Sequence, residues 1–375
     1  MSFENRVLRE DERATYQLRN LYLQHGYSHY RVSKFEEYDL YAKNKSFLVS
    51  ENLLTFTDTN GKLMALKPDV TLSIIKNVVA DVKNSYKVYY DEHVYRTTSS
   101  GDGFREITQT GLESIGNIDV FAESEVIMLA MKSLFSISED YLLDISHMRL
   151  LEGLVESLGV DSADISEIFA LFGSKNVSGL RALCLKYGID SGTADKLCEL
   201  AAMYLPIGRA LDILKPYVVG DKMQTAFDEL EEICAAMREY GLADKLYLDL
   251  SIVNDMNYYD GVIFKGFVNG IPDSILSGGR YDRLMERFGK KMGAVGFAVY
   301  LDKLERFGNI SDGFDVDYML VYDSDVSSAE IIAAAKKLGG DGSSVRASSV
   351  ADAGVRYRKL VRLSKEGIVN CEAND

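Results

Sequence analysis

A long polar hairpin in the middle of the chain has the residue types and the spacing of a small-molecule site. Residues 87–96 and 104–115 each alternate, and a Ser, Thr and Gly cluster separates them, so the pattern predicts two strands joined by a turn. Alternate residues of a strand share a face, and one face here carries charged and amide side chains with open space at a glycine. Such a face suits a ligand cradle, whereas the spacing alone favours a solvent-exposed hairpin that is simply polar outside. The residues concerned are Arg96 on the first strand and Arg105, Gln109, Gly111 and Glu113 on the second.

Two further groups of polar residues accompany the hairpin. Asp69 and Thr71 stand at the start of a predicted helix, where a plain role in starting the helix is an adequate alternative to ligand binding. Tyr258 and Tyr259 follow the strand predicted for residues 246–253, where aromatic packing at a strand end is the common case. The residues alone therefore leave both groups open between a structural role and a binding role.

The elements that must position these side chains belong to an α+β fold. Leu53 to Leu66 predicts a hairpin around Asn60-Gly61, the strongest short-range hairpin signal. Apolar periodicity predicts the remaining elements. They are helices at 11–24, 122–135 and 148–158, a largely helical stretch from 160 to about 240, and strands at 141–146 and 262–268.

The last part of the chain restarts after Gly308. We expect a small α/β domain here, shorter than the usual domain size, with a basic stretch that we interpret as a solvated helix face. Its expected elements are a strand at 317–322, a helix at 327–338, a turn at 339–344, the basic helix at 356–365 and a strand at 367–371.

Composition excludes several classes of protein. The 375 residues carry a net charge of −15, which argues against nucleic-acid binding because that binding depends on Lys and Arg. No run is long enough to span a membrane and no signal segment is present, so we expect a cytoplasmic protein. The four cysteines form no CxxC pair and the four histidines are dispersed, so neither a metal site nor a disulfide framework is expected. No cofactor is expected either.

The hairpin resembles motif 2 of the class II aminoacyl-tRNA synthetases in its histidyl form, which continues as R-E-x-x-Q-x-G-x-E after a strand, an Arg and a loop. Residues 254–261, NDMNYYDG, are similar to the signature R-G-L-D-Y-Y-T-G, and residues 278–282 match GGRYD, which we interpret as a close-approach glycine turn. Residues 292–304 resemble motif 3. Helix 11–24 and the strand after it resemble motif 1 without its proline, and in the family motif 1 builds a homodimer.

The resemblance implies a histidine site. By family, the acidic residue and Thr at positions 69 and 71 bind the amino group, and the carboxylate, ammonium and imidazole of histidine would face Arg96, Gln109 and Glu113, respectively. An Asp beside an α-ammonium forms a charge-assisted hydrogen bond, which is suitable chemistry. The full set implied for histidine is Asp69, Thr71, Arg96, Gln109, Glu113, Tyr258 and Tyr259.

The nucleotide features of the same family are altered. Thr98 replaces the adenine-reading Glu, and Asn254 replaces the arginine that acts on the α-phosphate, with loss of its charge. Tyr300 replaces the glycine against which ATP lies, and only glycine tolerates that approach. Lys303 replaces the arginine that clamps the γ-phosphate and lacks its bidentate fork.

These differences are typical of the histidyl-tRNA synthetase paralogues that serve as regulatory subunits of ATP phosphoribosyltransferase. The resemblance implies a class II synthetase-like domain at 1–308, an antiparallel sheet flanked by helices with a helical insertion at about 160–240, and a truncated α/β remnant at 309–375. It implies no catalytic residue of its own, a short-form catalytic transferase partner, and feedback inhibition by histidine. The alternatives are an active histidyl-tRNA synthetase and a synthetase-like amino-acid-binding module of another pathway.

Overall fold

The computed structural model describes residues 8–44, 48, 53–79, 85–97, 103–160, 162–253, 258–306 and 314–373. The chain forms two compact units, a larger one over residues 10–304 and a smaller one that begins at residue 305, and each is described by itself. The domain boundary expected after residue 308 lies outside the described residues.

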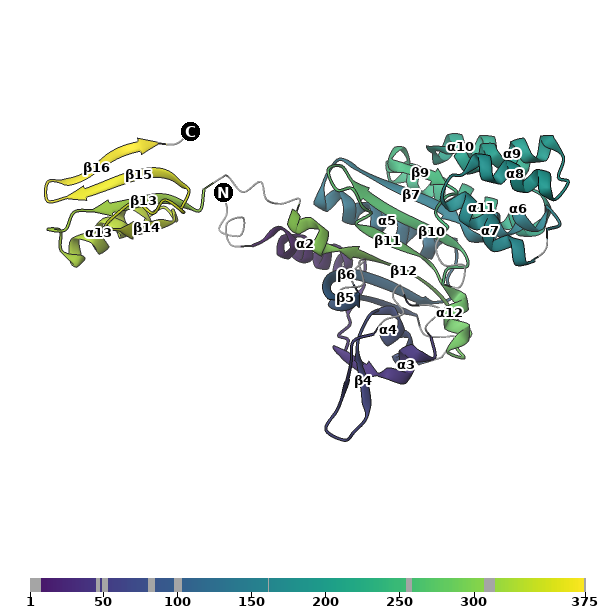
Figure 1. The fold of residues 1–375 in the computed structure, drawn as a ribbon, viewed down its shortest axis with the longest axis horizontal. Coiled ribbons are helices and arrows are strands. Elements are labelled where there is room, and N and C mark those ends of the chain that lie inside the picture. Colours follow the sequence, from purple (N-terminus) through teal and green to yellow (C-terminus); the bar gives the residue numbers. More distant parts are fainter. Residues whose placement is uncertain are drawn as a thin grey trace. The chain divides into compact units, whose positions relative to one another are not determined.

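A nine-stranded sheet is the centre of the larger unit (Figure 1). Most neighbouring strands run antiparallel, whereas β1 pairs parallel with β5 and β7 pairs parallel with β9. The predicted α+β class is confirmed, and the sheet is mixed rather than wholly antiparallel. In sheet order the strands are β1 (Ser28–His29), β5 (Tyr86–Thr97), β6 (Phe104–Gly116), β12 (Gly293–Tyr300), β11 (Leu276–Arg280), β10 (Val262–Val268), β7 (Tyr141–His147), β9 (Leu246–Asp249) and β8 (Tyr204–Pro206).

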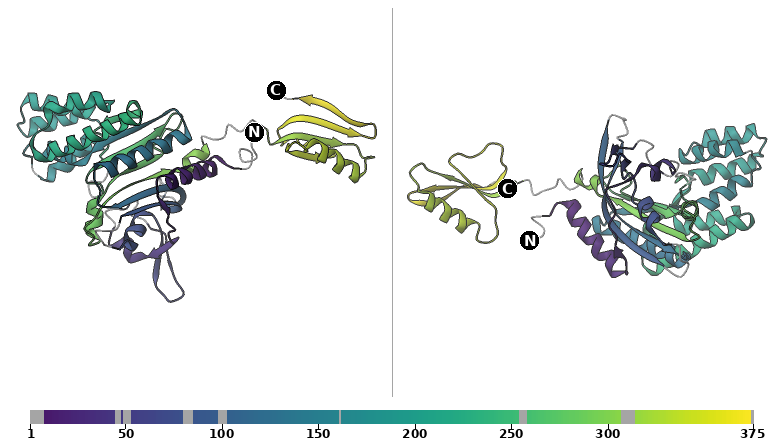
Figure 2. Two further views of the ribbon diagram at one scale, coloured as in Figure 1. Left: turned by 180° about the vertical axis from the view of Figure 1, so that it is seen from behind. Right: turned by 90° about the horizontal axis from the view of Figure 1, so that it is seen from below.

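Helices α2 and α5 cover one face of this sheet, as the view from behind in Figure 2 shows. The side chain of Asp119 accepts a hydrogen bond from the backbone N–H of Ala122 and so caps α5. Helix α5 is buried over most of its circumference, which is typical of a core helix. The helices of the larger unit are α2 (Glu10–Gln24), α3 (Tyr38–Ala42), α4 (Thr71–Asn77), α5 (Val120–Ile137), α6 (Met148–Glu156), α7 (Ser162–Gly173), α8 (Val177–Lys186), α9 (Ser191–Ala202), α10 (Ile207–Leu214), η2 (Lys215–Tyr217), α11 (Gly220–Glu239), η3 (Ala243–Lys245), α12 (Asp282–Arg287) and η4 (Leu301–Arg306).

The stretch expected to be helical from 160 to about 240 is helical for the most part, but it also contributes the edge strand β8. Tyr204 stacks on Tyr247 of β9, with ring centroids 5.1 Å apart, and its hydroxyl donates to the carboxylate of Asp144 at 3.1 Å. Pro206, which has no N–H to donate, is tolerated because β8 is an edge strand.

A small three-stranded sheet projects from the larger unit and contains the hairpin predicted around Asn60-Gly61. The turn is as expected: Gly61 has φ +79°, and the Asp58 carboxylate accepts from the backbone N–H groups of Asn60 and Lys62, both at 2.8 Å. The strands, in sheet order, are β2 (Phe35–Glu37), β4 (Leu63–Leu66) and β3 (Thr55–Thr57).

The smaller unit packs helix α13 against a four-stranded sheet. The basic stretch predicted to be a helix is strand β15 instead, and that prediction is wrong. Val361 and Leu363 are buried and alternate with the exposed Arg362, which is the period of a strand and not of a helix. Arg362 donates to the Asp323 carboxylate at 2.8 Å. The elements are β13 (Val316–Tyr322), α13 (Ser328–Leu338), β14 (Val345–Ser348), β15 (Tyr357–Ser364) and β16 (Gly367–Ala373), with sheet order β14-β13-β15-β16.

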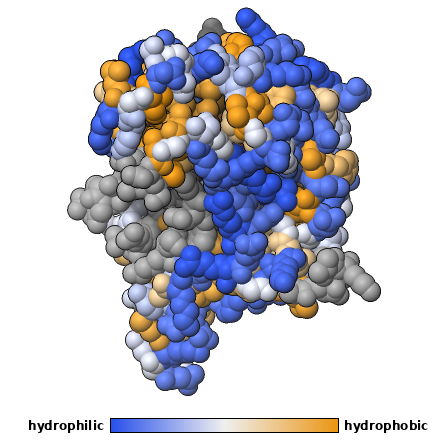
Figure 3. Space-filling model, turned by 90° about the vertical axis from the view of Figure 1, so that its right-hand side faces the viewer, coloured by the Kyte–Doolittle hydropathy of each residue, from blue (hydrophilic) through white to orange (hydrophobic). Residues whose placement is uncertain are grey.

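The face of the larger unit in Figure 3, which has the helical region above and the β3–β4 hairpin below, is mostly hydrophilic with hydrophobic residues gathered in its upper part. Among the helices that the structure describes, none combines the length and the apolar character needed to cross a bilayer.

Candidate functional site

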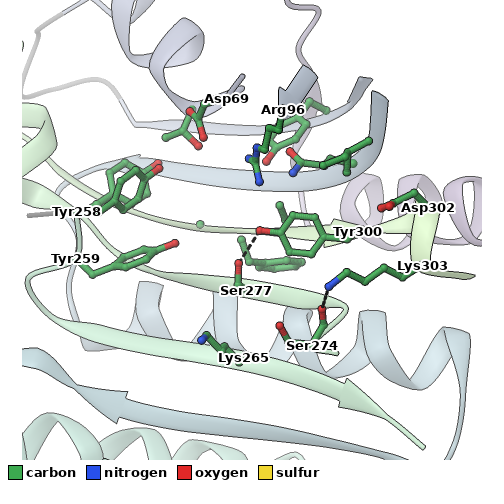
Figure 4. Close-up of a pocket in the computed structure, with 18 of the residues that line it drawn as sticks. Asp69, Arg96, Tyr258, Tyr259, Lys265, Ser274, Ser277, Tyr300, Asp302 and Lys303 are labelled. Carbon is green, nitrogen blue, oxygen red and sulfur yellow. Dashed lines mark hydrogen bonds between the residues drawn. The ribbon is translucent and has the colours of Figure 1, made fainter. Parts of the chain in front are cut away.

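A cavity of about 650 Å3 lies on the sheet face opposite α2 and α5 (Figure 4). This volume is typical of small-molecule sites. The seven residues that the resemblance assigns to histidine all line it, although they come from four separate segments. They are Asp69, Thr71, Arg96, Gln109, Glu113, Tyr258 and Tyr259.

The hairpin β5–β6 forms one wall, and the predicted alternation is confirmed. Arg105, Gln109 and Glu113 all face the cavity. The space expected at Gly111 is not open, because its cross-strand neighbour Tyr90 fills it: a Cβ at Gly111 would lie 2.5 Å from the Tyr90 hydroxyl. A glycine opposite an aromatic residue lets the ring lie flat over the strand.

Glu113 is the most deeply buried acid of this wall, with 2% of its surface exposed. Its carboxyl accepts hydrogen bonds from the Thr71 hydroxyl, at 2.7 Å, and from the Tyr281 hydroxyl. Burial raises its pKa to about 8, with a smaller contribution from the nearby Asp69 carboxylate. Glu113 is therefore mostly protonated at neutral pH in the ligand-free chain. A neutral carboxyl can both donate to and accept from an uncharged heterocycle.

Helix α4 forms the second wall and is held at both ends. At its start the Asp69 carboxylate accepts from the backbone N–H of Leu72 at 2.9 Å. At its end the buried Lys290 ammonium donates to the carbonyl oxygen of Val78, at 2.6 Å, and to that of Ile75. Burial raises the pKa of Asp69, and the Arg96 charge opposes that effect.

The third wall contains the two predicted tyrosines. The rings of Tyr258 and Tyr259 meet edge to face with centroids 4.6 Å apart, and Tyr281 lies 5.8 Å from Tyr258. The Asp260 carboxylate that follows them accepts from the backbone N–H of Arg283 at 2.7 Å. The tyrosines line the cavity and also take part in aromatic packing, so the packing interpretation is confirmed, whereas the binding role stays a prediction.

The predicted glycine turn in residues 278–282 is wrong, because Gly278 and Gly279 lie inside strand β11. The glycines are needed for close approach within the sheet. A Cβ at Gly278 would lie 2.5 Å from the Phe297 Cβ, and one at Gly279 would lie 2.7 Å from the ring of Tyr259. Gly296 of β12 lines the cavity floor, and its sheet neighbour Gly279 leaves room for Tyr259, whereas Gly278 points to the opposite sheet face, against Phe264 and Phe297.

Tyr300 divides the cavity into two halves (Figure 4). Its hydroxyl and that of Ser277 are hydrogen-bonded at 2.9 Å, so the ring crosses the floor. We call the part with Asp69, Tyr258 and Tyr259 the inner half, and the part with Asp302 and Lys303 the outer half. Gln109 lies at the boundary, because it pairs with Tyr300 in the sheet.

The cationic side chains of the outer half are bonded to other groups of the same chain. Lys303 donates to the carbonyl oxygen of Ser274 at 2.6 Å, and Arg105 forms an ion pair with Asp302. Lys303 also lies 5.3 Å from the centre of the Tyr300 ring. Two other positions with altered nucleotide features, Thr98 and Asn254, lie outside the described residues.

Several lining residues had no role in the sequence interpretation. Tyr90 and Tyr281 contact the binding wall through cross-strand and tertiary packing, which spacing does not reveal. Lys265 did leave a signal, as the single charge in the apolar strand VIFKGFV. The described residues contain no cluster of His, Cys, Asp and Glu arranged to hold a metal ion.

Comparisons with known proteins agree with this fold. A family model described as histidyl-tRNA synthetase matches residues 4–304. The chain is 30% identical over 290 residues to an ATP phosphoribosyltransferase regulatory subunit of Alkaliphilus metalliredigens, with 76% of this chain and 73% of that protein covered.

Two solved structures share the fold, and thereby confirm the predicted class II synthetase-like architecture. An ATP phosphoribosyltransferase regulatory subunit/histidyl-tRNA synthetase from Bacillus halodurans has a TM-score of 0.75 at 23% identity, covering 95% of this chain and 94% of that one. A chain of the ATP phosphoribosyltransferase (HisG:HisZ) complex from Thermotoga maritima has a TM-score of 0.62 at 20% identity, covering 78% and 97%. From the family match and the sequence identity together, the chain belongs to the histidyl-tRNA synthetase family and, within it, to the regulatory subunits of ATP phosphoribosyltransferase.

Proposed function

We propose that this regulatory subunit has no catalytic activity of its own and that it holds free histidine in the inner half of the cavity as the feedback signal for the first step of histidine biosynthesis. The contrast between the two halves carries the proposal. The inner half joins an acid beside α4, a buried carboxyl and an aromatic wall, which match the ammonium and imidazole of histidine. The outer half is crossed by Tyr300, where a nucleotide would need space.

Each group of histidine has a partner in this proposal. Asp69 and Gln109 receive the ammonium, Arg96 faces the carboxylate, and Glu113 bonds the imidazole. Thr71 orients Glu113 through its hydroxyl. The edges of Tyr258 and Tyr259 enclose the ring, as expected for a planar heterocycle.

Loss of synthetase activity is part of the proposal and can be tested directly. Lys303 is committed to a backbone carbonyl and Arg105 to Asp302, so neither is available to a triphosphate without losing a partner. We expect no histidine-dependent exchange of pyrophosphate into ATP. Clear turnover in that assay would replace the proposal with an active histidyl-tRNA synthetase.

The proposed partner is a short-form catalytic ATP phosphoribosyltransferase chain, in an assembly where this chain forms a homodimer. The names of the relatives and the solved Thermotoga maritima complex support this partner. A regulator needs different affinities for histidine in two states of the assembly. The decisive experiment is co-purification with the catalytic chain, followed by a transferase assay with and without histidine. Activity that needs this chain and falls with histidine is expected.

A thermal-shift comparison separates the remaining alternative, a binding module for another amino acid. A ligand that binds only the native state raises the melting temperature, so histidine should raise it more than any other amino acid does. A larger rise in melting temperature with a different amino acid would indicate that the protein serves another pathway.

Two further expectations from the sequence, the division into domains and the location, remain part of the proposal. A synthetase-like domain at 1–308, with a helical insertion at about 160–240, and a remnant at 309–375 are supported by the two compact units. A cytoplasmic location is supported by the free, buried thiols of Cys184, Cys198 and Cys234.

A further inference from the structure

Lys265 is a cation of the cavity that lies at the boundary between the two halves, because it pairs in the sheet with Ser277, and it makes no hydrogen bond or ion pair with any residue that the structure describes. Its neighbours Phe264 and Gly266 are buried on the sheet face that packs on α5, where a Cβ at Gly266 would lie 2.7 Å from Leu134. Because side chains alternate along a strand, Lys265 points to the opposite face and into the cavity. Figure 4 shows Lys265 and Arg96 on opposite sides of the cavity.

The acids closest to Lys265 are already used elsewhere. The Asp144 carboxylate accepts from the Tyr204 hydroxyl, and the Asp249 carboxylate pairs with Lys175 at 3.0 Å and accepts from the backbone N–H of Ser251 at 2.9 Å. Asp144 stands directly opposite Lys265 on strand β7, and both acids attract the Lys265 ammonium, but burial, together with the charge of Lys303, outweighs them and lowers its pKa. Neither acid forms an ion pair with Lys265, so a ligand carboxylate could supply one.

The other cations of the cavity have partners. Arg96 donates through Nε to the carbonyl oxygen of Pro68 at 2.9 Å, and its charge faces Asp69. Lys303 and Arg105 are bound in the outer half, as described above. At the boundary, the side-chain amide nitrogen of Gln109 is buried and has no partner within the described ranges. The inner half and its boundary thus contain two donors that lack an acceptor.

The distance across the floor suits one amino acid. Lys265 lies in β10 and Glu113 in β6, three strands apart. At about 4.8 Å per strand spacing, β6 and β10 are about 14 Å apart. In the sheet register Gly296 and Gly279 lie beside Glu113, whereas Lys265 pairs with Ser277, whose hydroxyl is bonded to that of Tyr300, so a ligand would reach Lys265 past these two hydroxyls. A glutamate, a lysine and an amino acid between them can span that distance.

We infer that Lys265 binds the free α-carboxylate of the amino acid, opposite Arg96, and so restricts the pocket to ligands with an unmodified carboxylate. The inference rests on the proposed function and names one of its specificity determinants. Asp69 on one wall and Lys265 on another form a pair of opposite charges, complementary to a zwitterion. A histidine derivative with a neutral amide in place of the carboxylate would leave the buried ammonium unpaired.

The test compares the affinities of histidine and histidinamide by titration calorimetry. The wild-type chain should prefer histidine by about tenfold or more, and Lys265→Met should lower this ratio severalfold, to the part that Arg96 provides. Lys303→Met is the matched control: it removes the same charge from the same cavity, but beyond Tyr300, and should leave the preference unchanged. Lys265→Arg should retain it.

Each outcome has one meaning. A Lys265→Met chain that keeps the wild-type preference overturns the inference and leaves the proposed function intact. Equal losses of the preference for histidine in Lys265→Met and Lys303→Met also overturn it. The preference would then depend on the overall electrostatic potential of the cavity and not on a contact with Lys265. A wild-type chain that binds no histidine, alone or with the catalytic chain, contradicts the proposed function itself. Circular dichroism of each variant checks its fold, and Lys265→Gln, which also removes the charge, serves as the test if Lys265→Met does not fold.

Discussion

Lys265 and Lys303 are two lysines of one cavity, and burial lowers the pKa of both. Lys303, in the outer half, donates to the Ser274 carbonyl, whereas Lys265, at the boundary with the inner half, has no hydrogen bond or ion pair among the residues that the structure describes. A group that is already bonded gains little from a ligand, and a buried group without a partner gains much. A cavity can therefore be lined by polar groups throughout and still offer unpaired polar groups to a ligand in only one part. One atom is an exception, since Asp302 Oδ1 in the outer half is buried without a partner.

The largest expected effect comes from the glycine floor of the inner half. In Gly296→Ala the added Cβ would overlap the Glu113 carboxyl and lie 2.5 Å from the carbonyl oxygen of Leu112. We expect a loss of about 1–3 kcal/mol in the free energy of unfolding, together with loss of histidine binding. Urea unfolding and calorimetry measure the two. Gly103→Ala, directly before strand β6 and with nothing within 4 Å of the added atom, should change neither, and equal effects in both variants would contradict the role of the floor.

The next largest effect compares one acid in each half. Asp69→Asn removes the charge beside the ligand ammonium but keeps an oxygen to accept from the Leu72 N–H. Histidine affinity should fall by about 30- to 100-fold, because a hydrogen bond between charged groups contributes about 2–3 kcal/mol. Asp302→Asn makes the same change in the outer half and should leave the affinity unchanged. If calorimetry shows that both weaken binding alike, the division into halves is wrong.

A third effect follows from the buried carboxyl of Glu113. Its pKa is raised from an ordinary value near 4.5 to about 8, so the stability that its protonated form provides is complete below the unfolded pKa. That contribution is lost as the pH rises through the window from about 4.5 to 8, at roughly 1 kcal/mol per pH unit.

Glu113→Gln imitates the protonated carboxyl and should flatten this part of the profile. In ligand-free protein its melting temperature should therefore exceed that of the wild-type chain increasingly from pH 5 to pH 8. Glu123 and Asp144, whose pKa values burial also raises, are present in both proteins and cancel. Parallel melting curves across the window would show that Glu113 is charged in the folded chain.

The smallest expected effect tests the division of the cavity by Tyr300. Tyr300→Phe removes the hydroxyl that is bonded to Ser277 but keeps the ring in place. We expect a loss of about 1 kcal/mol or less in unfolding free energy and unchanged histidine affinity. A variant that bound histidine much more weakly would place Tyr300 within the inner half.

Period-two alternation allowed the hairpin wall to be predicted, because Arg105, Gln109 and Glu113 share a face whatever the strand packs against. The pairing of Gly111 with Tyr90 could not be predicted, since it depends on the register between two strands. Lys265 shows the same limit: its place within an apolar strand was visible, but the face to which it points required the position of α5.

The errors have physical causes of the same kind. Arg358 and Arg362 are four residues apart, which suits a helix face, but they form ion pairs with Asp317 of the neighbouring strand β13 and with Asp323, which directly follows that strand. Gly278-Gly279 has the composition of a turn, yet it lies in β11 because the Phe297 and Tyr259 side chains need its space. In both cases a partner distant in sequence decides the structure.

Helix α4 is short and anchored at its two ends, by Asp69 before it and by Lys290 after it. If histidine binds as proposed, we expect an element held in this way to stay in place as a fixed surface of the cavity. A conformational change that reaches a catalytic chain would then have to pass through the opposite wall of the cavity. There Arg149 of α6 donates to the carbonyl oxygen of Asp260, next to Tyr259, and Glu229 of α11 accepts from His147 at 2.7 Å. Histidine should accordingly slow amide hydrogen exchange around Asp260 while leaving α4 unchanged, and the helical region would become the route by which occupancy is communicated.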